Sequence, residues 1–188
     1  MKRTLIILSA ILLLLPVYCI YGYHGLGTHF QDAGREEGQT LVMFWNLENL
    51  FDWCRDTLGG NESEAEFSSF GKKHWTKRRF LAKCNAIAKS IFWVKDKEGI
   101  LPDVIGIAEV ENRFVLERLL RETPLYKTDY RIVHFDSPDP RGIDVALLYR
   151  SSRLELIQAK PIAVGGGTDP PFRTRDILLA RFRKPDGD

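Results

Sequence analysis

Residues 41–50 read LVMFWNLENL, an apolar run that gives way at once to amide and carboxylate side chains. The run itself, residues 40–45, is typical of a buried strand, and residues 46–49 form a polar break at its carboxyl end. Residues 104–112, VIGIAEVEN, repeat the arrangement, with Glu109 directly after a second apolar run. The carboxyl ends of neighbouring strands form the usual ligand crevice of an α/β sheet. The two stretches therefore predict a polar site at one edge of a sheet.

Further elements follow from residue spacing. Apolar side chains at helical intervals predict a helix from Thr76, as its N-cap, to Val94. A second, short helix is predicted over residues 114–121, and four strands come after it, at residues 130–135, 143–149, 154–160 and 177–182. Strands without helices between them thus follow two strand–helix units, so the sequence predicts an α/β (α+β) fold with a mixed sheet.

The composition fits one globular domain preceded by a leader. The chain has 188 residues, of which 44% are hydrophobic and 28% charged, and it contains no low-complexity tract that would indicate long disorder. Lysine and arginine total 27 and aspartate and glutamate total 25; without Lys2 and Arg3 of the leader, the basic residues fall to 25. This near-neutrality argues against non-specific nucleic-acid binding through a broad basic surface, so phosphate affinity must come from a local site.

The first 22 residues have the layout of an export signal. Lys2 and Arg3 precede an apolar run from Leu5 to Leu15, and Pro16 follows it. A positive start and an apolar run of about 7–15 residues are typical of a secretory signal peptide, whereas a membrane span needs about 20. We expect residues 1–22 to be a signal peptide and the protein to be exported. Retention of this segment as an N-terminal membrane anchor is the second reading.

Residues 23–39 are rich in glycine and polar side chains and are interpreted as a linker, which leaves residues 40–188 for the domain. Cys19 would be the attachment point if the leader were that of a lipoprotein, although the bulky residue before it is unfavourable for that cleavage. A disulfide between Cys54 and Cys84 is open in an exported protein. The place of Cys84 on the apolar stripe of the predicted helix favours a buried free thiol instead.

Phosphate-ester cleavage makes a clear demand on side chains, because the charge on phosphorus and on the leaving oxygen must be neutralised. A hard divalent cation such as Mg²⁺ does this and takes oxygen ligands while it keeps several waters. Glu48 and Glu109, each just past an apolar run, are placed to bind it, and Asn46 and Asn49 can orient a phosphate oxygen or a metal ligand. Taken singly, these residues also fit solvated loops or turns. His134, within a predicted strand, fits a structural role.

Three segments in order resemble motifs of the endonuclease/exonuclease/phosphatase superfamily. Residues 44–50, FWNLENL, resemble its first motif, a strand ending in W-N-x-x-N/G-L, and residues 102–112, PDVIGIAEVEN, resemble P-D-x-x-x-x-Q-E-V, which delivers a metal-binding Glu. Residues 141–149, RGIDVALLY, resemble the following G-x-x-V/A-x-L-Y strand, and a basic helix over residues 77–90 lies in the expected place between the first two motifs. The resemblance covers roughly residues 40–182.

This resemblance implies part of a four-layer α/β sandwich with mixed sheets and a divalent-metal phosphoesterase activity. It implies Glu109 as the main ligand of Mg²⁺ or Mn²⁺ and Asn46 as an amide that organises phosphate and metal. Glu48 matches a position that is acidic in some members only. Arg173 and Arg175, just before the last predicted strand, either clamp a substrate phosphate through bidentate contacts or are solvated strand-edge residues.

The later motifs of the superfamily are not found within residues 1–188. They are a histidine segment N-H-W/F-x-S, a G-D-F-N loop and a terminal S-D-H that supplies the general base. Without a general base about 10²–10⁴ in rate is lost. We therefore expect a fragment of a longer enzyme, with the C-terminal part of the domain absent and no turnover by these residues alone. The alternative is a truncated or degenerate, non-catalytic phosphate-binding module of the same fold.

Relatives act on DNA or RNA, sphingolipid head groups and inositol phosphates. The resemblance therefore implies a phosphodiester substrate without choosing among nuclease-like, sphingomyelinase-like and inositol-phosphatase-like activities. Membrane attachment through residues 1–22 is the other expected interaction, and no obligate protein partner is implied. An exported structural or adhesion protein would not explain polar clusters at the ends of two apolar strands.

Overall fold

The structure is a computed structural model and describes residues 39–53, 66–164 and 173–185. The predicted leader, most of the predicted linker and Cys54 lie outside these ranges. In chain order the elements are β1 (Val42–Leu50), α2 (Lys77–Glu98), β2 (Val104–Val110), α3 (Arg113–Arg121), the 3₁₀ helix η1 (Pro124–Lys127), β3 (Tyr130–His134), β4 (Asp144–Arg150), β5 (Glu155–Ile162) and β6 (Ile177–Arg183). Within the described ranges, no helix is both long and apolar enough to cross a membrane.

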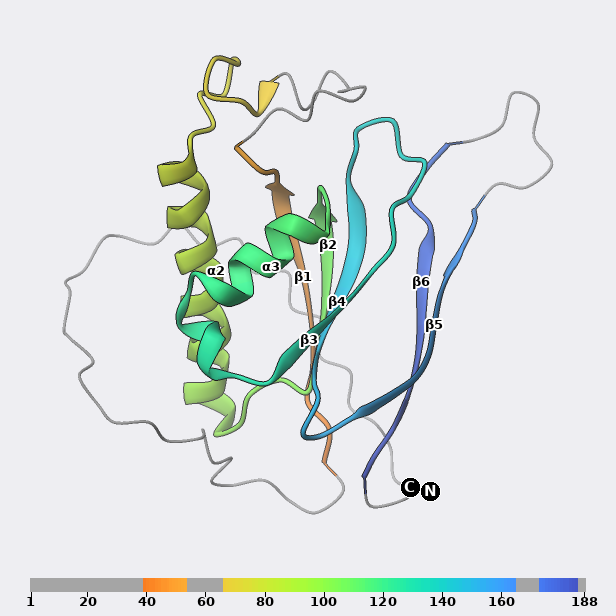
Figure 1. The fold of residues 1–188 in the computed structure, drawn as a ribbon. Coiled ribbons are helices and arrows are strands. Elements are labelled where there is room, and N and C mark those ends of the chain that lie inside the picture. The colour runs from red at the N-terminus through yellow and green to blue at the C-terminus, as the bar shows by residue number, and fades with distance from the viewer. Residues whose placement is uncertain (1–38, 54–65, 165–172, 186–188) are drawn as a thin grey trace.

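The strands form two sheets. β1, β2, β4 and β3 lie side by side in that order, with β1 and β2 parallel and the other pairs antiparallel. β5 and β6 form a separate antiparallel pair. Figure 1 shows α2 and α3 on one face of the four-stranded sheet and β5–β6 on the other, where the ring centroids of Tyr149 and Phe182 lie 5.1 Å apart. The predicted α+β fold with a mixed sheet is confirmed, as a layer of helices followed by two sheets.

Helix α2 connects the two parallel strands. Thr76 caps its first turn, because its side chain accepts a hydrogen bond from the backbone N–H of Arg79. The helix continues to Glu98, four residues past the predicted end. Its last turn contains lysines, which favour a helix C-terminus, and Gly99 in the left-handed conformation is the residue that ends it. One stripe of the helix is buried: Phe80, Cys84, Ile87, Ala88 and Ile91.

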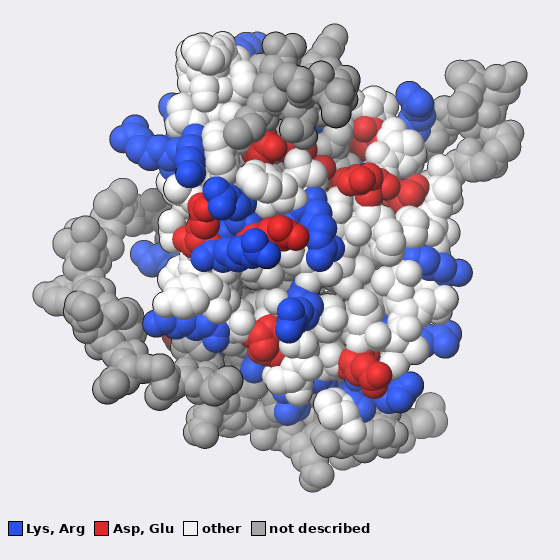
Figure 2. Space-filling model, in the orientation of Figure 1, with Lys and Arg blue, Asp and Glu red and all other residues white. Residues whose placement is uncertain are grey.

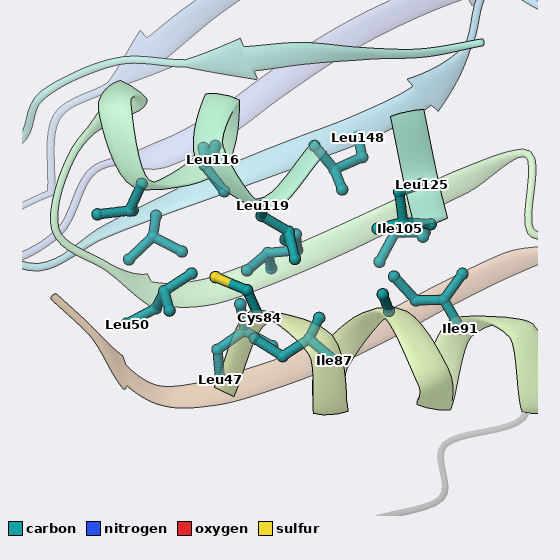
Figure 3. Packing of buried hydrophobic residues seen from close by; sticks show 14 of the residues in the cluster. Leu47, Leu50, Cys84, Ile87, Ile91, Ile105, Leu116, Leu119, Leu125 and Leu148 are labelled. Atoms are coloured by element: carbon teal, nitrogen blue, oxygen red, sulfur yellow. The ribbon is translucent and has the colours of Figure 1, made fainter. Parts of the chain in front are cut away.

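The main core lies between the helices and the four-stranded sheet (Figure 3). Leu116 and Leu119 of α3 belong to one buried cluster with Ile105 of β2 and Leu148 of β4. Cys84 lies in the same cluster with a free thiol, and burial raises its pKa to about 12. The expected buried free thiol is therefore confirmed.

Strand β1 is not the fully buried strand that its apolar run predicts. Val42 and Phe44 are 63% and 69% exposed, whereas Met43 and Trp45 alternate with them and pack against the core. The reason is that β1 lies at the edge of the sheet, where the helices cover one face of it. Phe44 lies close over Gly106 of β2, where an added Cβ would come within 2.9 Å of the ring.

Candidate metal and phosphate site

The polar break predicted after the first apolar run is in fact a distorted continuation of β1. Asn46 pairs with Ala108, and the next matched pair is Leu50 with Val110, so the intervening residues of β1 stand opposite Glu109 alone. Glu109 is also the extra residue in the pairing of β2 with β4, since Ala108 and Val110 pair with consecutive residues of β4. Such bulges re-aim side chains and are over-represented next to active sites.

Three residues in these bulges have a left-handed backbone. The φ angle is 53° at Glu48, 64° at Asn49 and 63° at Glu109. For residues other than glycine this conformation costs on the order of 1–3 kcal/mol each, so it persists only where the surroundings enforce it. Backbone strain is thus concentrated at residues that the sequence singles out as a site.

The two bulges are joined by a hydrogen bond between side chains. Asn46 Nδ2 donates to Glu109 Oε1 at 3.0 Å, and Asn46 Oδ1 accepts from the backbone N–H of Glu48 at 2.8 Å. Because a carboxylate can only accept and an N–H can only donate, these partners fix which way the amide faces. Within the described residues, Glu109 Oε2 accepts no hydrogen bond, so this oxygen is available to a ligand.

Lys83 of α2 holds the strained end of β1. Its Nζ donates to the carbonyl oxygens of Glu48 at 2.7 Å and Asn49 at 3.2 Å, and it lies 5.7 Å from the ring centroid of Trp75. Burial lowers the pKa of Lys83, while the charges of Glu48 and Glu109 act in the opposite direction. The ammonium group therefore belongs to the same electrostatic cluster as the two carboxylates.

The residues just past the bulges have structural roles. The carboxylate of Glu111 accepts a hydrogen bond from the backbone N–H of Asp52 at 2.6 Å, and the N–H of Glu111 donates to Leu50 O at 3.1 Å. Asn112 caps α3, because its Oδ1 accepts from Val115 N at 3.1 Å. These contacts extend the β1–β2 connection and fix the helix start beyond the site.

A third segment, residues 135–143 between β3 and β4, brings Arg141 to the same end of the sheet, where Arg175 from the segment before β6 meets it. Asp139 accepts hydrogen bonds from Arg141 Nε at 3.2 Å and Nη2 at 3.0 Å, and Arg175 Nε lies 3.5 Å from Asp139 Oδ2. Burial acts to raise the pKa of Asp139, but the hydrogen bonds from Arg141 and the charges of both arginines outweigh it and hold that pKa below its ordinary value. The carboxylate is therefore ionised between two guanidinium groups.

His134, Asp136 and Asp144 form a second cluster of metal-type ligands, with one atom of each within 4.8 Å of the others. Asp144 Oδ2 lies 3.0 Å from His134 Nε2, and Oδ1 accepts from the N–H and hydroxyl of Ser137 at 2.9 and 2.6 Å. Both oxygens of Asp144 are therefore already used. We interpret the cluster as the anchor that fixes the start of the 135–143 segment, in line with the structural role predicted for His134.

The structure brings together only some of the predicted site residues. Asn46 and Glu109 meet through their side chains at the β1–β2 bulges, and Glu48 joins them through its backbone N–H. Asn49 contributes its backbone carbonyl to Lys83, and among the described residues its side chain makes no hydrogen bond to Asn46 or Glu109. Arg175 joins the 135–143 segment through Asp139, whereas Arg173 is exposed and makes no ion pair with any described residue.

Sequence reasoning missed three residues of this region. Lys83 was included only in the basic helix predicted over residues 77–90, yet it directly precedes the buried Cys84, and that spacing was a signal of its position. Asp139 was given no role, and Arg141 was named only as the first residue of the segment 141–149. These residues form a turn, since Gly142 N donates to Asp139 O at 2.9 Å with Gly142 at φ 64°, and the side chain of Arg141 bonds the buried carboxylate of Asp139.

The donor atoms of the site fit a hard divalent cation. Glu109 Oε2, the exposed carboxylate of Glu48 and the amide of Asn46 are all oxygen ligands or hydrogen-bond partners of such ligands. One or two protein carboxylates, with waters and substrate oxygens in the remaining positions, are what Mg²⁺ usually takes. The residues present therefore match the Mg²⁺ or Mn²⁺ that the resemblance implies.

Comparison with known proteins gives one result. No curated protein matches the chain. The sequence model of the endonuclease/exonuclease/phosphatase family matches residues 41–185, a range that begins one residue before β1 and ends two residues after β6. The match includes both bulges, Lys83 and the 135–143 segment, and it spans well over half of the chain. This chain therefore belongs to the endonuclease/exonuclease/phosphatase family.

Proposed function

We propose that the protein is an exported phosphoesterase that hydrolyses phosphate ester bonds with Mg²⁺ or Mn²⁺ at Glu109. Members of its family generally hydrolyse phosphate esters and typically depend on a divalent metal. The observation that supports the assignment to these residues is the 3.0 Å hydrogen bond from Asn46 to Glu109, made between two opposed strand bulges. Export is proposed from the leader pattern in residues 1–22 alone.

In this proposal Glu109 is the principal metal ligand and Glu48 a second oxygen donor. A divalent cation bound there would neutralise the negative charge that builds up on the phosphoryl group. Asn46 uses one N–H to fix the Glu109 carboxylate, so that Oε2 stays directed to the ligand, and its second N–H is available to a phosphate oxygen. Because the amide is also held by Glu48 N, it needs no reorganisation when substrate binds.

A second candidate is a non-catalytic phosphate-binding module of the same fold. Water activation needs a base, and histidine is the usual one. Within the described residues, His134 is bonded to Asp144, and no other imidazole contacts Asn46 or Glu109. This observation favours binding without turnover by the residues described.

The charge distribution bears on the substrate. Figure 2 shows basic and acidic side chains interspersed on one face of the molecule, without a broad basic surface. A duplex or a long single strand is usually bound along such a basic surface. Because the chain as a whole has 27 basic and 25 acidic residues, we propose a phosphodiester recognised locally at its phosphate, with lipid head groups, inositol phosphates and nucleic-acid ends as the classes to be compared. Asn49, Arg173 and Arg175 are proposed phosphate contacts.

Metal binding tests the assignment directly. Mn²⁺ affinity, measured by electron paramagnetic resonance on the full chain, is expected to fall at least tenfold in Glu109→Gln and to stay unchanged in Glu117→Gln. Glu117 is the matched control, since it lies on α3 in an i,i+4 pair with Arg113. Equal Mn²⁺ affinity of the Glu109→Gln and Glu117→Gln proteins would reject the metal site.

Turnover separates the two functions. Metal-dependent release of nitrophenol from bis(p-nitrophenyl) phosphate by the full chain, lost in Glu109→Gln, supports the enzyme. Metal-dependent binding of phosphate without release supports the binding module, and it is also the result expected of residues 1–188 alone, in which the general-base motif is not found. A chain that neither binds phosphate nor releases nitrophenol would contradict both candidate functions.

A further inference from the structure

Asp139 is a buried carboxylate beneath two arginine side chains. Its own side chain is 4% exposed, whereas that of Arg141 is 55% exposed. Three groups of Arg141 bind it: the backbone N–H at 2.9 Å, Nε at 3.2 Å and Nη2 at 3.0 Å. Arg175, from the segment that enters β6, adds a contact at 3.5 Å. A buried charge needs such partners, but one arginine would have been enough to neutralise it.

The contacts leave part of each guanidinium group unused. Arg141 binds Asp139 through Nε and Nη2, which is one edge of its planar fork. Among the described residues, Arg141 Nη1 donates no hydrogen bond, and Arg175 makes no ion pair other than the one with Asp139. A planar fork that is fixed along one edge and open along another is already ordered for a second oxyanion.

Arg141 and Arg175 lie at the same end of the sheet as the proposed metal site at Glu109. β2 and β4 pair Val110 with Asp144, so the turn that ends at Gly142 lies next to the Glu109 bulge. The hydrogen bond to Asp139 and, to a smaller extent, the charge of Glu109 raise the pKa of Arg141. Figure 1 shows the segment between β3 and β4 and the start of β6 at the end of the molecule where β1 and β2 terminate.

We propose that Arg141 and Arg175, held on Asp139, form a phosphate-binding arginine pair beside Glu109, with Asp139 as its positioning residue. The ligand class is a phosphate monoester or diester, whose non-bridging oxygens face the open edges of the two guanidinium groups. The proposal rests on the proposed function, since it adds the substrate-side contacts to the same site. Two arginines and one aspartate leave one net positive charge, which offsets part of the repulsion of a phosphate by Glu48 and Glu109 when metal is absent.

The test is isothermal titration calorimetry, in which inorganic phosphate is titrated into the full chain in the presence of EDTA. Arg141→Gln is expected to raise the phosphate dissociation constant at least tenfold. Arg131→Gln, which removes an exposed arginine from β3, is expected to leave it unchanged. Arg141→Lys keeps the charge but not the fork, so an intermediate loss is expected. Asp139→Asn keeps both arginines and removes only their support; weaker binding with a native circular dichroism spectrum identifies positioning.

The outcomes decide the proposal even if a variant fails to fold. Asp139 is buried, so its substitution can unfold the chain, but Arg141 is half exposed and its variant tests the pair independently. Equal phosphate affinity of the wild-type, Arg141→Gln and Arg131→Gln proteins, or no phosphate binding by the wild type, would overturn the proposal. Because EDTA removes metal and no turnover is measured, failure of the Mn²⁺ site at Glu109 leaves this result readable by itself.

Discussion

Replacing Lys83 with methionine removes the ammonium group that holds the end of β1 and keeps most of the apolar stem. In the native protein Nζ donates to the carbonyls of Glu48 and Asn49 at 2.7 and 3.2 Å. Both acceptor residues have positive φ, 53° and 64°, a conformation that costs on the order of 1–3 kcal/mol each and depends on its surroundings. Loss of the ammonium group should therefore destabilise the turn and, with it, the protein.

The magnitude follows from these contacts. A hydrogen bond from a charged donor contributes about 1.5–3 kcal/mol where it is well buried. Here one bond is exposed and the other partly buried, so water replaces much of each, and the burial that lowers the pKa of Lys83 offsets a further part. We expect a net loss of about 1–2 kcal/mol, and at about 2–4 °C per kcal/mol for a domain of this size the Tm falls by roughly 2–8 °C.

Thermal unfolding followed by circular dichroism measures this difference. Lys89→Met is the matched control, because Lys89 is exposed on the same helix. Lys83→Arg is expected to lower the Tm by less than half as much as Lys83→Met, since a guanidinium group can donate to both carbonyls. If Lys83→Met and Lys89→Met unfold at the same temperature, the ammonium group does not hold the turn and the reasoning is refuted.

Two other predictions concern the core. Leu116 is 0% exposed, so Leu116→Ala should cost about 2–5 kcal/mol, seen as a lower urea midpoint; a cost below 1 kcal/mol would contradict the packing described. The pKa of Cys84 is raised from 9.0 to about 12 in the folded protein, so its contribution to stability is complete below pH 9 and is lost as pH rises through about 12. In a Cys19→Ser/Cys54→Ser chain, a thiol reagent at pH 8 should label Cys84 only after urea is added, and rapid labelling without urea would disagree.

Local sequence signals predicted the order of the elements. Helical spacing and Thr76 located the start of α2, and each predicted strand from β2 to β6 lies within two residues of its observed bounds. These features depend on interactions between residues near one another in the chain, which periodicity and capping report. The prediction that β1 is buried on both faces was wrong, because an apolar run does not indicate whether both faces of its strand are covered.

The site was predicted only in part, for a related reason. Asn46 and Glu109 follow apolar runs, but that local signal also fits solvated loops, and the resemblance of residues 44–50 and 102–112 to family motifs was needed to select them. The paired bulges were not predicted, because nothing in Leu47–Asn49 requires positive φ, and the Lys83 ammonium group that bonds the carbonyls of Glu48 and Asn49 comes from a distant helix. The contact between Asp139 and Arg175 likewise joins distant segments, and only the folded chain reveals it.

The hydrogen bond between Asn46 and Glu109 also has a consequence for how the protein folds. Its partners are 63 residues apart in the chain, and between them lie a long connection and the whole of α2. Closing such a loop costs entropy before any contact repays it, so parallel pairs form late compared with helices. A contact made late is weak in the folding transition state, and a ligand that binds there slows unfolding more than it speeds folding. A cation bound at Glu109 would thus slow unfolding and leave the folding rate nearly unchanged.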